Sequence, residues 1–178
     1  MKYLVHPLET KRLRFSAVSL ADFNEWLPFF ADARAWQHWP GERLAPEEEC
    51  RKWYARQAER YASNLGGMNA LADKSTGKLV GYAGLLVQEV DGVTELEVAY
   101  SILPRYWGLG FATEAAIACR DFAFANALAG SLISIIALSN TASQKVARNN
   151  GMKPEKETLY RGHRVFIFRV HKIDIVSS

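Results

Sequence analysis

Residues 97–115 read EVAYSILPRYWGLGFATEA, and this stretch decides the fold. It begins as an apolar strand that ends near Leu103, and an amphipathic helix is expected from about Phe111 onward. Between them, glycines at positions 108 and 110 let the backbone turn sharply without a Cβ in the way. The first N–H groups of the helix then point outward without partners, and the helix dipole adds positive potential there. The pattern predicts an anion site suited to a pyrophosphate.

The spacing of this turn excludes two commoner nucleotide-binding motifs. It lacks the third glycine of G-x-G-x-x-G, the acidic residue expected about 20 residues later, and the Gly-Lys-Ser/Thr of a P-loop. A Gly-x-Gly pair by itself is equally compatible with an ordinary strand-to-helix turn. The segments around the turn therefore have to decide between the two interpretations.

Outward from this stretch, the chain alternates strands and helices. Strands are expected over residues 8–15, 68–72, 79–87, 94–103 and 132–138, and residues 160–170 are expected to form a final strand or one arm of a hairpin. Helices are expected after a cap at Ser19 and over residues 46–62, 111–126 and 141–149. The pattern predicts an α/β (α+β) fold with a βαβ unit in its second half, in one domain over residues 1–178.

The composition is that of a globular protein and excludes several classes of function. Of the 178 residues, 49% are hydrophobic and 23% charged, and the net charge is +3. The basic residues are scattered, so no nucleic acid is expected as a partner. Apolar runs such as residues 132–138 are too short to span a bilayer, so we expect a cytoplasmic protein without a membrane partner. Cys50 and Cys119 lack metal-type spacing, and no metal is expected.

The decisive stretch resembles a known family motif almost position for position. EVAYSILPRYWGLGFATEA is similar to the central motif of the ribosomal-protein N-terminal (RimJ/RimL-like) acetyltransferase branch of the GNAT superfamily. The segments NTAS at 140–143 and NNGM at 149–152 resemble the Asn-x-x-Ser and Gly-Phe of that branch. With the similar opening at residues 8–13, the resemblance covers about residues 8 to 170. Trp107 stands where many superfamily members carry Gln or Arg, but Trp is usual in this branch.

The resemblance implies a GNAT fold that binds acetyl-CoA. Its central sheet would be mixed, mostly antiparallel and flanked by about four helices. The sheet would splay between its fourth and fifth strands, which end near Leu103 and Asn140, and pantetheine would lie in the splay. The implied cofactor contacts are the main chain of Tyr100, Ser101 and Ile102, the amides of Trp107, Gly108, Leu109, Gly110, Phe111, Ala112 and Thr113, and Asn140 from the opposite strand.

The implied reaction is direct attack of a primary amine on the acetyl thioester, and it needs a proton acceptor. Glu97 is the best candidate base, because it lies in an apolar strand just before the predicted pantetheine segment and matches a family Glu. Two alternatives stay open in which Glu97 is not the base and a water relay accepts the proton. In one, Glu97 is a solvated strand residue like Glu95, and in the other it is a ligand for the acceptor ammonium group.

The reaction also needs a proton donor for the leaving thiolate and a site for the oxyanion. Ser143 matches the position where relatives place a hydroxyl near the cofactor sulfur. Its alternative is a first-turn serine that bonds to the backbone, with Tyr160 or Tyr106 as rival donors. A strand amide near Tyr100, exposed by a bulge, is the expected oxyanion site.

The acceptor is the least determined part of the prediction. Trp26, Trp36, Trp39 and Trp53 are expected mainly in the core, although their helices usually form the acceptor wall in this superfamily. Trp36 and His38 are therefore candidate acceptor contacts. The implied acceptor is a protein N-terminus or a small amine, and a homodimer is compatible with the sequence. The alternative from another class is a catalytically idle acyl-CoA-binding sensor or regulatory module.

Overall fold

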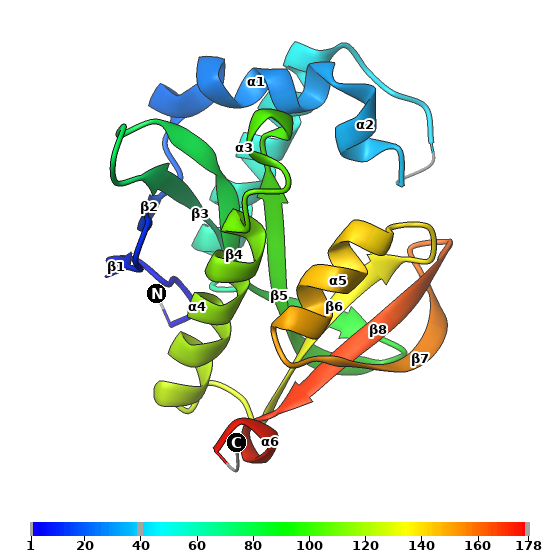
Figure 1. The fold of residues 1–178 in the computed structure, drawn as a ribbon. Coiled ribbons are helices and arrows are strands. Elements are labelled where there is room, and N and C mark those ends of the chain that lie inside the picture. The colour runs from blue at the N-terminus through cyan, green and yellow to red at the C-terminus, as the bar shows by residue number, and fades with distance from the viewer. Residues whose placement is uncertain (1, 39–40, 177–178) are drawn as a thin grey trace.

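Eight strands form one sheet, and helices pack against both of its faces (Figure 1). The computed structural model describes residues 2–38 and 41–176. The strands are β1 (Leu8–Glu9), β2 (Leu13–Ala17), β3 (Gly66–Asp73), β4 (Leu79–Val90), β5 (Val93–Ile102), β6 (Ser131–Ala137), β7 (Lys153–Tyr160) and β8 (His163–His171). The α-helices are α1 (Phe23–Ala31), α2 (Ala33–Trp36), α3 (Pro46–Ala62), α4 (Phe111–Ala125), α5 (Thr141–Asn149) and α6 (Lys172–Val176). The strand order is β1-β2-β3-β4-β5-β6-β8-β7.

The long hairpin of β4 and β5 supports the predicted site. Its turn residues Asp91 and Gly92 have φ values of 51° and 76°, the left-handed backbone that two-residue hairpins favour. The two strands then pair antiparallel and without a register shift from Val90↔Val93 to Gly81↔Ile102. The hairpin therefore carries the predicted site segment as a regular strand.

The aromatic residues of α1 and α3 cover one face of this hairpin. Trp26 is fully buried, and its ring centre lies 4.4 Å from that of Phe29, 4.7 Å from Tyr82 and 5.6 Å from Trp53. Such clusters bury a large apolar area and fix ring orientation. The core role expected for Trp26 and Trp53 is confirmed.

The helix α4 covers the opposite face of the same strands. Its buried side is mostly small, with Ala115, Ala116, Cys119 and Ala123 all fully buried against the main core. Small side chains let a helix lie close to a sheet. The short connection at residues 103–110 then places the first turn of α4 next to the end of β5.

The sheet splays between β5 and β6. These strands run parallel, and their only register pair is Glu97↔Ile133. Beyond it they diverge, with α4 against one half of the sheet and α5 against the other (Figure 1). The splay therefore lies between the two segments for which it was predicted. These segments are the fifth and sixth strands rather than the fourth and fifth, because the opening segment forms two short strands, β1 and β2.

The sequence did not predict β7. The strand reads KPEKETLY, which has charges and a proline but no apolar alternation. It is an edge strand paired only with β8, and its register shifts between Pro154 and Lys156. Edge strands carry charges and proline without loss of core, so the periodicity that reveals inner strands is missing. The described part of the chain has six α-helices rather than about four, because α2 and α6 are short additions.

Candidate functional site

The N-terminus of α4 has the geometry expected of an anion cradle. Gly108 and Gly110 have φ values of 76° and 82°, and Gly110 is the N-cap of the helix. Within the described residues, no acceptor bonds to the amides from Gly108 to Thr113. The amide of Trp107, which was also predicted for the cradle, instead donates to the carbonyl of Pro104 at 3.1 Å. The free amides and the helix dipole make this turn suited to a phosphate.

The side chain of Trp107 links the cradle to the end of β5. Its indole Nε1 donates to the carbonyl of Ile102 at 2.7 Å. The ring stays 41% exposed, with the guanidinium carbon of Arg34 5.6 Å from its centre. Trp107 therefore occupies one of the main-chain acceptors that the sequence assigned to pantetheine.

The alternation of β5 selects which main-chain groups face the splay. Leu103 N–H donates to Val80 of β4 at 2.9 Å, so odd-numbered residues of β5, including Ser101, direct their main chain toward β4. Val98, Tyr100 and Ile102 direct theirs toward the splay. Because Ser134 Oγ donates to the Val98 carbonyl at 2.8 Å, the free groups at the open end include those of Tyr100.

The expected bulge near Tyr100 is wrong. The pairing of β4 with β5 shows no register shift, and the divergence of β6 exposes the Tyr100 main chain instead. Ser101 lies in the predicted segment, but its main chain is directed into the sheet.

Glu97 lies at the root of the splay. It is only 8% exposed, and its Oε2 accepts a 2.7 Å hydrogen bond from Gln88 Nε2. Burial raises the pKa of the carboxyl group. Hydrogen bonds from Gln88 and the Ile135 main chain, and the charges of Arg60 and Arg161, oppose that rise. A buried carboxylate with a raised pKa is suited to accept a proton near neutral pH.

Sequence reasoning missed the residues that hold Glu97. The Tyr160 hydroxyl donates to Gln88 Oε1 at 3.0 Å, and this bond orients the Gln88 amide toward Glu97. Tyr160, a rival proton donor by sequence, is thus engaged on β7. No local pattern marks Gln88, because its role depends on the pairing of β4 with β5.

Ser143 and Asn140 lie on the other side of the splay. Asn140 is the N-cap of α5, and its Oδ1 accepts from Ser143 N–H at 3.0 Å. The Tyr100 hydroxyl reaches across from β5 and donates to the Ser143 carbonyl at 2.9 Å. Burial raises the pKa of this phenol. A side-chain hydrogen bond from Ser143 partly opposes that rise in pKa, so the Ser143 hydroxyl lies beside the Tyr100 phenol at the mouth of the splay.

The two acceptor candidates differ in position. His38 Nδ1 lies 2.9 Å from the hydroxyl of Ser139, next to the Asn140 cap, so His38 spans the open end of the splay. Trp36 packs within its own segment. Its Nε1 donates to the carbonyl of Phe30 at 3.1 Å, and its ring centre lies 3.9 Å from the Arg43 guanidinium carbon. Trp39 lies outside the described residues.

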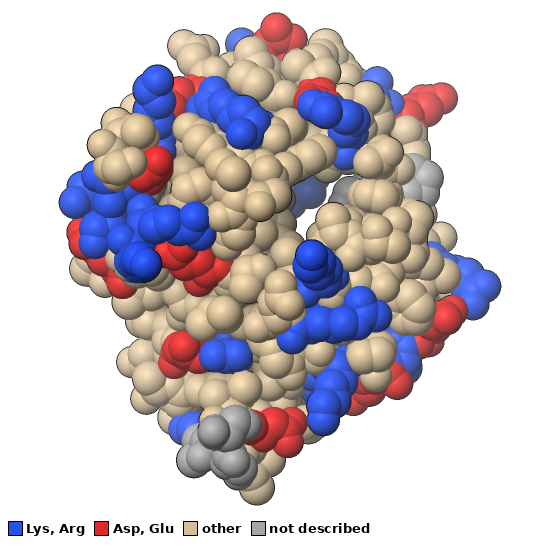
Figure 2. Space-filling model, viewed as in Figure 1, with Lys and Arg blue, Asp and Glu red and all other residues tan. Residues whose placement is uncertain are grey.

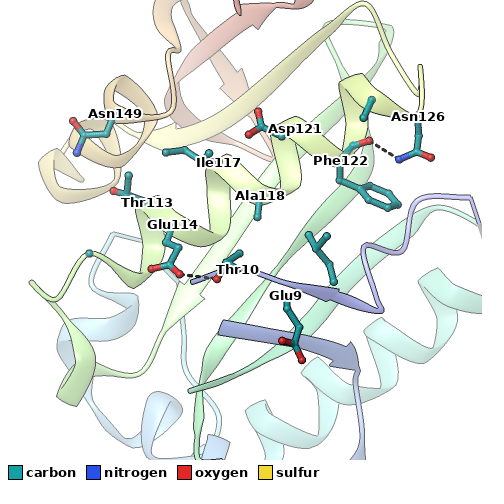
Figure 3. Close-up of a pocket in the computed structure, with 13 residues that line it drawn as sticks. Glu9, Thr10, Thr113, Glu114, Ile117, Ala118, Asp121, Phe122, Asn126 and Asn149 are labelled. Carbon is teal, nitrogen blue, oxygen red and sulfur yellow. Dashed lines mark hydrogen bonds between the residues drawn. The ribbon is translucent and has the colours of Figure 1, made fainter. Parts of the chain in front are cut away.

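Two hollows adjoin these residues. The space-filling view shows an opening between the region of α1 and α2 and the half that carries α5 (Figure 2). A second cavity of about 850 Å³ follows the outer side of α4 from Gly110 to Asn126, with Leu8, Glu9 and Thr10 on its other wall (Figure 3). Gly110 and Thr113 belong to both the cradle and this cavity.

Two features are absent from the described part of the chain. None of the helices in that part combines the length and the apolar character that crossing a bilayer requires. No group of three or more His, Cys, Asp or Glu side chains among the described residues is arranged to hold a metal ion.

Sequence comparison finds a relative in Bacillus subtilis, the uncharacterized protein YkkB. The two are 35% identical over 104 residues, which are 58% of this chain and 59% of the length of YkkB. This chain therefore matches less than two thirds of that relative.

Structure comparison finds the same fold in known acetyltransferases. The ribosomal-protein-S5-alanine acetyltransferase of Vibrio fischeri is 19% identical, with a TM-score of 0.70 over 93% of this chain and 96% of its own. The spermidine N-acetyltransferase of Vibrio cholerae, solved with CoA and spermine, is 16% identical, with a TM-score of 0.73 over 94% and 99%. Residues 12–153 match the family described as an acetyltransferase (GNAT) domain.

Proposed function

The chain belongs to the GNAT acetyltransferase family, and from this premise we propose that it transfers an acetyl group from acetyl-CoA to a primary amine. One observation carries the proposal. A cradle of free amides at the start of α4 opens onto a splay whose root holds the buried carboxylate of Glu97. An anion site and a proton acceptor on the same cleft are what this reaction requires.

The residues present fit coenzyme A. The amides from Gly108 to Thr113 would hold its diphosphate, and a Cβ built on Gly108 meets no atom within 4 Å, so the turn is open to a ligand. The free main chain of Tyr100 would pair with the pantetheine arm as a neighbouring strand does. Asn140, which uses Oδ1 for its cap, keeps its amide N–H groups for the cofactor.

Two groups of the chain would carry the proton transfers, and a third would stabilise the oxyanion. Bound acetyl-CoA supplies the acetyl group as a thioester. Glu97 accepts the proton that the amine loses on attack, and the Tyr100 N–H donates to the oxygen that gains negative charge. The Ser143 hydroxyl donates a proton to the departing thiolate and regains one from solvent, and Glu97 releases its proton to solvent before the next turnover. Tyr100 positions Ser143 through the bond to its carbonyl.

The acceptor we propose is a protein N-terminus or a small amine. Both kinds occur among proteins of this fold, since one similar structure is a ribosomal L7/L12 alpha-N-protein acetyltransferase and another a spermidine N-acetyltransferase. On this chain, the opening beside His38 would admit the acceptor, and Trp36 would form part of its wall.

A thiol-release assay tests the function. The purified chain is incubated with acetyl-CoA and, in separate reactions, with N-terminal peptides, polyamines and amino acids. We expect free CoA thiol to appear with at least one acceptor, matched mole for mole by acetylated amine in mass spectra. Tight CoA binding without turnover on any acceptor would instead identify an idle acyl-CoA-binding module.

Replacing Ser143 with alanine is expected to lower kcat by about 10-fold and to leave the KM for acetyl-CoA nearly unchanged. The effect is smaller than usual for acid catalysis, because a thiol with a pKa of about 8.5 also leaves as thiolate. The cap should survive, since Asn140 bonds to the Ser143 N–H and not to its side chain. Steady-state kinetics measure the change, with exposed Thr141→Ala on the same helix turn as the control. An unchanged kcat contradicts the role of Ser143.

A further inference from the structure

The loop before β2 is bonded to the first turn of α4. Glu114 Oε1 accepts from the Thr10 hydroxyl at 2.6 Å and from the Arg12 main-chain N–H at 2.9 Å. Glu114 Oε2 accepts from Arg12 Nε at 2.6 Å. Figure 3 shows Thr10 and Glu114 facing each other across the wall of the cavity. Both oxygens of one carboxylate are thus held by the same short loop.

The Arg12 guanidinium also reaches the glycine turn itself. Its Nη1 donates to the carbonyl of Leu109 at 2.8 Å, and its central carbon lies 4.3 Å from the centre of the Phe111 ring. Its Nη2 lies 3.5 Å from where a Cβ on Gly110 would stand. One side chain therefore contacts Leu109 and Phe111 and lies beside Gly110 between them.

The turn needs such an anchor from outside. Leu109 stands between two glycines with positive φ, and its own side chain is 54% exposed, so packing does not hold it. Glycine loses more backbone entropy on ordering than any other residue. Without a bond to Leu109, the free amides would have to be ordered by the anion, and affinity would fall.

The loop that supplies the anchor is itself fixed. Thr10 N–H donates to the Leu13 carbonyl at 2.8 Å, and Leu13 N–H returns a bond to the Thr10 hydroxyl at 3.0 Å. Leu13 is fully buried, and the Arg12 carbonyl accepts from Lys74 N–H at 2.8 Å. The loop can therefore act as a rigid support.

The ionisation of Glu114 is consistent with its pairing to Arg12. Partial burial alone would raise the pKa of Glu114, but the hydrogen bonds from Thr10 and Arg12 together lower it. Glu114 is thus ionised at neutral pH, and its charge is bound to Arg12. The side chain of Glu114 is 17% exposed and that of Arg12 is 40% exposed.

We propose that Arg12 and Glu114 form a positioning clamp that holds the Gly108–Gly110 turn in its anion-binding conformation. In this role the pair raises the affinity for the CoA diphosphate without Arg12 serving as its ligand. The inference rests on the proposed function, because it takes the anion to be that of CoA.

The direction in which one substitution changes the affinity for CoA tests the clamp. Glu114→Gln removes a negative charge beside the cradle, so electrostatics alone would tighten anion binding. The clamp predicts the reverse. We expect Glu114→Gln and Arg12→Met each to raise the Kd for CoA by about 10-fold, the size of one lost charge-assisted hydrogen bond. The Kd of the double variant for CoA should lie within about twofold of the higher of the two single-variant Kd values, because both substitutions remove the same clamp.

Isothermal titration with CoA measures these constants, and kinetics add a second readout. A positioning role raises the KM for acetyl-CoA and leaves kcat at saturation within about twofold. Arg12→Lys should bind CoA with intermediate affinity, because an ammonium group can pair with Glu114 but cannot also hold Leu109 in the same fork. Arg14→Met is the matched control, since Arg14 lies two residues later on β2 and forms an exposed ion pair with Glu9 of β1.

The outcomes separate cleanly. If the unaltered chain does not bind CoA, the proposed function fails first. If the unaltered chain binds CoA and Glu114→Gln binds it equally or more tightly, the clamp is overturned. If, in that case, Arg12→Met still binds CoA more weakly than the unaltered chain, Arg12 is a direct phosphate ligand. Circular dichroism confirms that each variant is folded at the titration temperature. If Arg12→Met does not fold, the CoA affinities of Arg12→Lys and Glu114→Gln still test the clamp.

Discussion

Replacing Gly110 with tryptophan is expected to weaken CoA binding by at least about 100-fold, the loss of more than one charge-assisted hydrogen bond. Gly110 has a φ of 82°, and a Cβ placed there would lie 3.5 Å from Arg12 Nη2. An indole at this point must either displace the Arg12 guanidinium or cover the free amides of the cradle. Either change removes the anion site, and isothermal titration with CoA measures the loss.

A matched substitution separates this effect from backbone strain. Gly162, in the turn between β7 and β8, has a φ of 81° and no atom within 4 Å of a built Cβ. Gly162→Trp therefore carries the same cost for left-handed backbone, about 1–2 kcal/mol of unfolding free energy. It should bind CoA as tightly as the unaltered chain. If Gly110→Trp also binds CoA with unchanged affinity, the diphosphate does not lie at the start of α4.

Replacing Glu97 with glutamine is expected to lower kcat/KM by about 10²–10⁴-fold near neutral pH, the usual contribution of a general base. Only the ionised carboxylate accepts a proton. Since burial raises the pKa of Glu97, the activity of the unaltered enzyme should fall as the pH falls through that raised value. The Glu97→Gln variant should lack this acidic limb. Its deficit should narrow at high pH, where more of the acceptor amine is already deprotonated.

The groups around Glu97 define what this pH profile reports. Arg60 from α3 and Arg161 from the β7–β8 turn contribute positive charge, while the hydroxyls of Tyr100 and Tyr160 lie in the same neighbourhood. Kinetics from pH 5 to 10 check the prediction, a range chosen to cover carboxyl and amine titration.

The control for this substitution is Glu95→Gln, two residues earlier on β5, where Glu95 pairs with Arg169 at 2.6 Å. It should keep the acidic limb. A loss in Glu97→Gln that is the same at every pH would assign Glu97 to acceptor binding instead.

Part of this molecule could be read from local patterns. The glycine turn before Phe111 and the helix over residues 46–62, which begins with a proline, both lie where the sequence predicts them. Each depends on backbone preferences within a few residues, which glycine and proline dominate. The βαβ order of β5, α4 and β6 follows from the same signals. These features suffice to predict an anion site at the start of α4, whereas the two strands between which the sheet splays were implied by the family resemblance.

Other features were decided by the tertiary structure alone. The edge strand β7 has no periodic pattern, because charges on an edge need no partner strand to cover them. The expected bulge near Tyr100 is absent, since the divergence of β6 already exposes that strand.

The environment of Glu97 and the bonds of Arg12 were likewise beyond the sequence. Gln88 meets Glu97 through strand pairing, and Arg12 meets Glu114 across 102 positions of sequence. The sequence by itself determined where this protein turns, caps and alternates, because those choices depend on each residue and its near neighbours. Only the tertiary structure decided which distant side chains hold the cradle and the carboxylate, because such contacts arise from the order in which strands and helices pack.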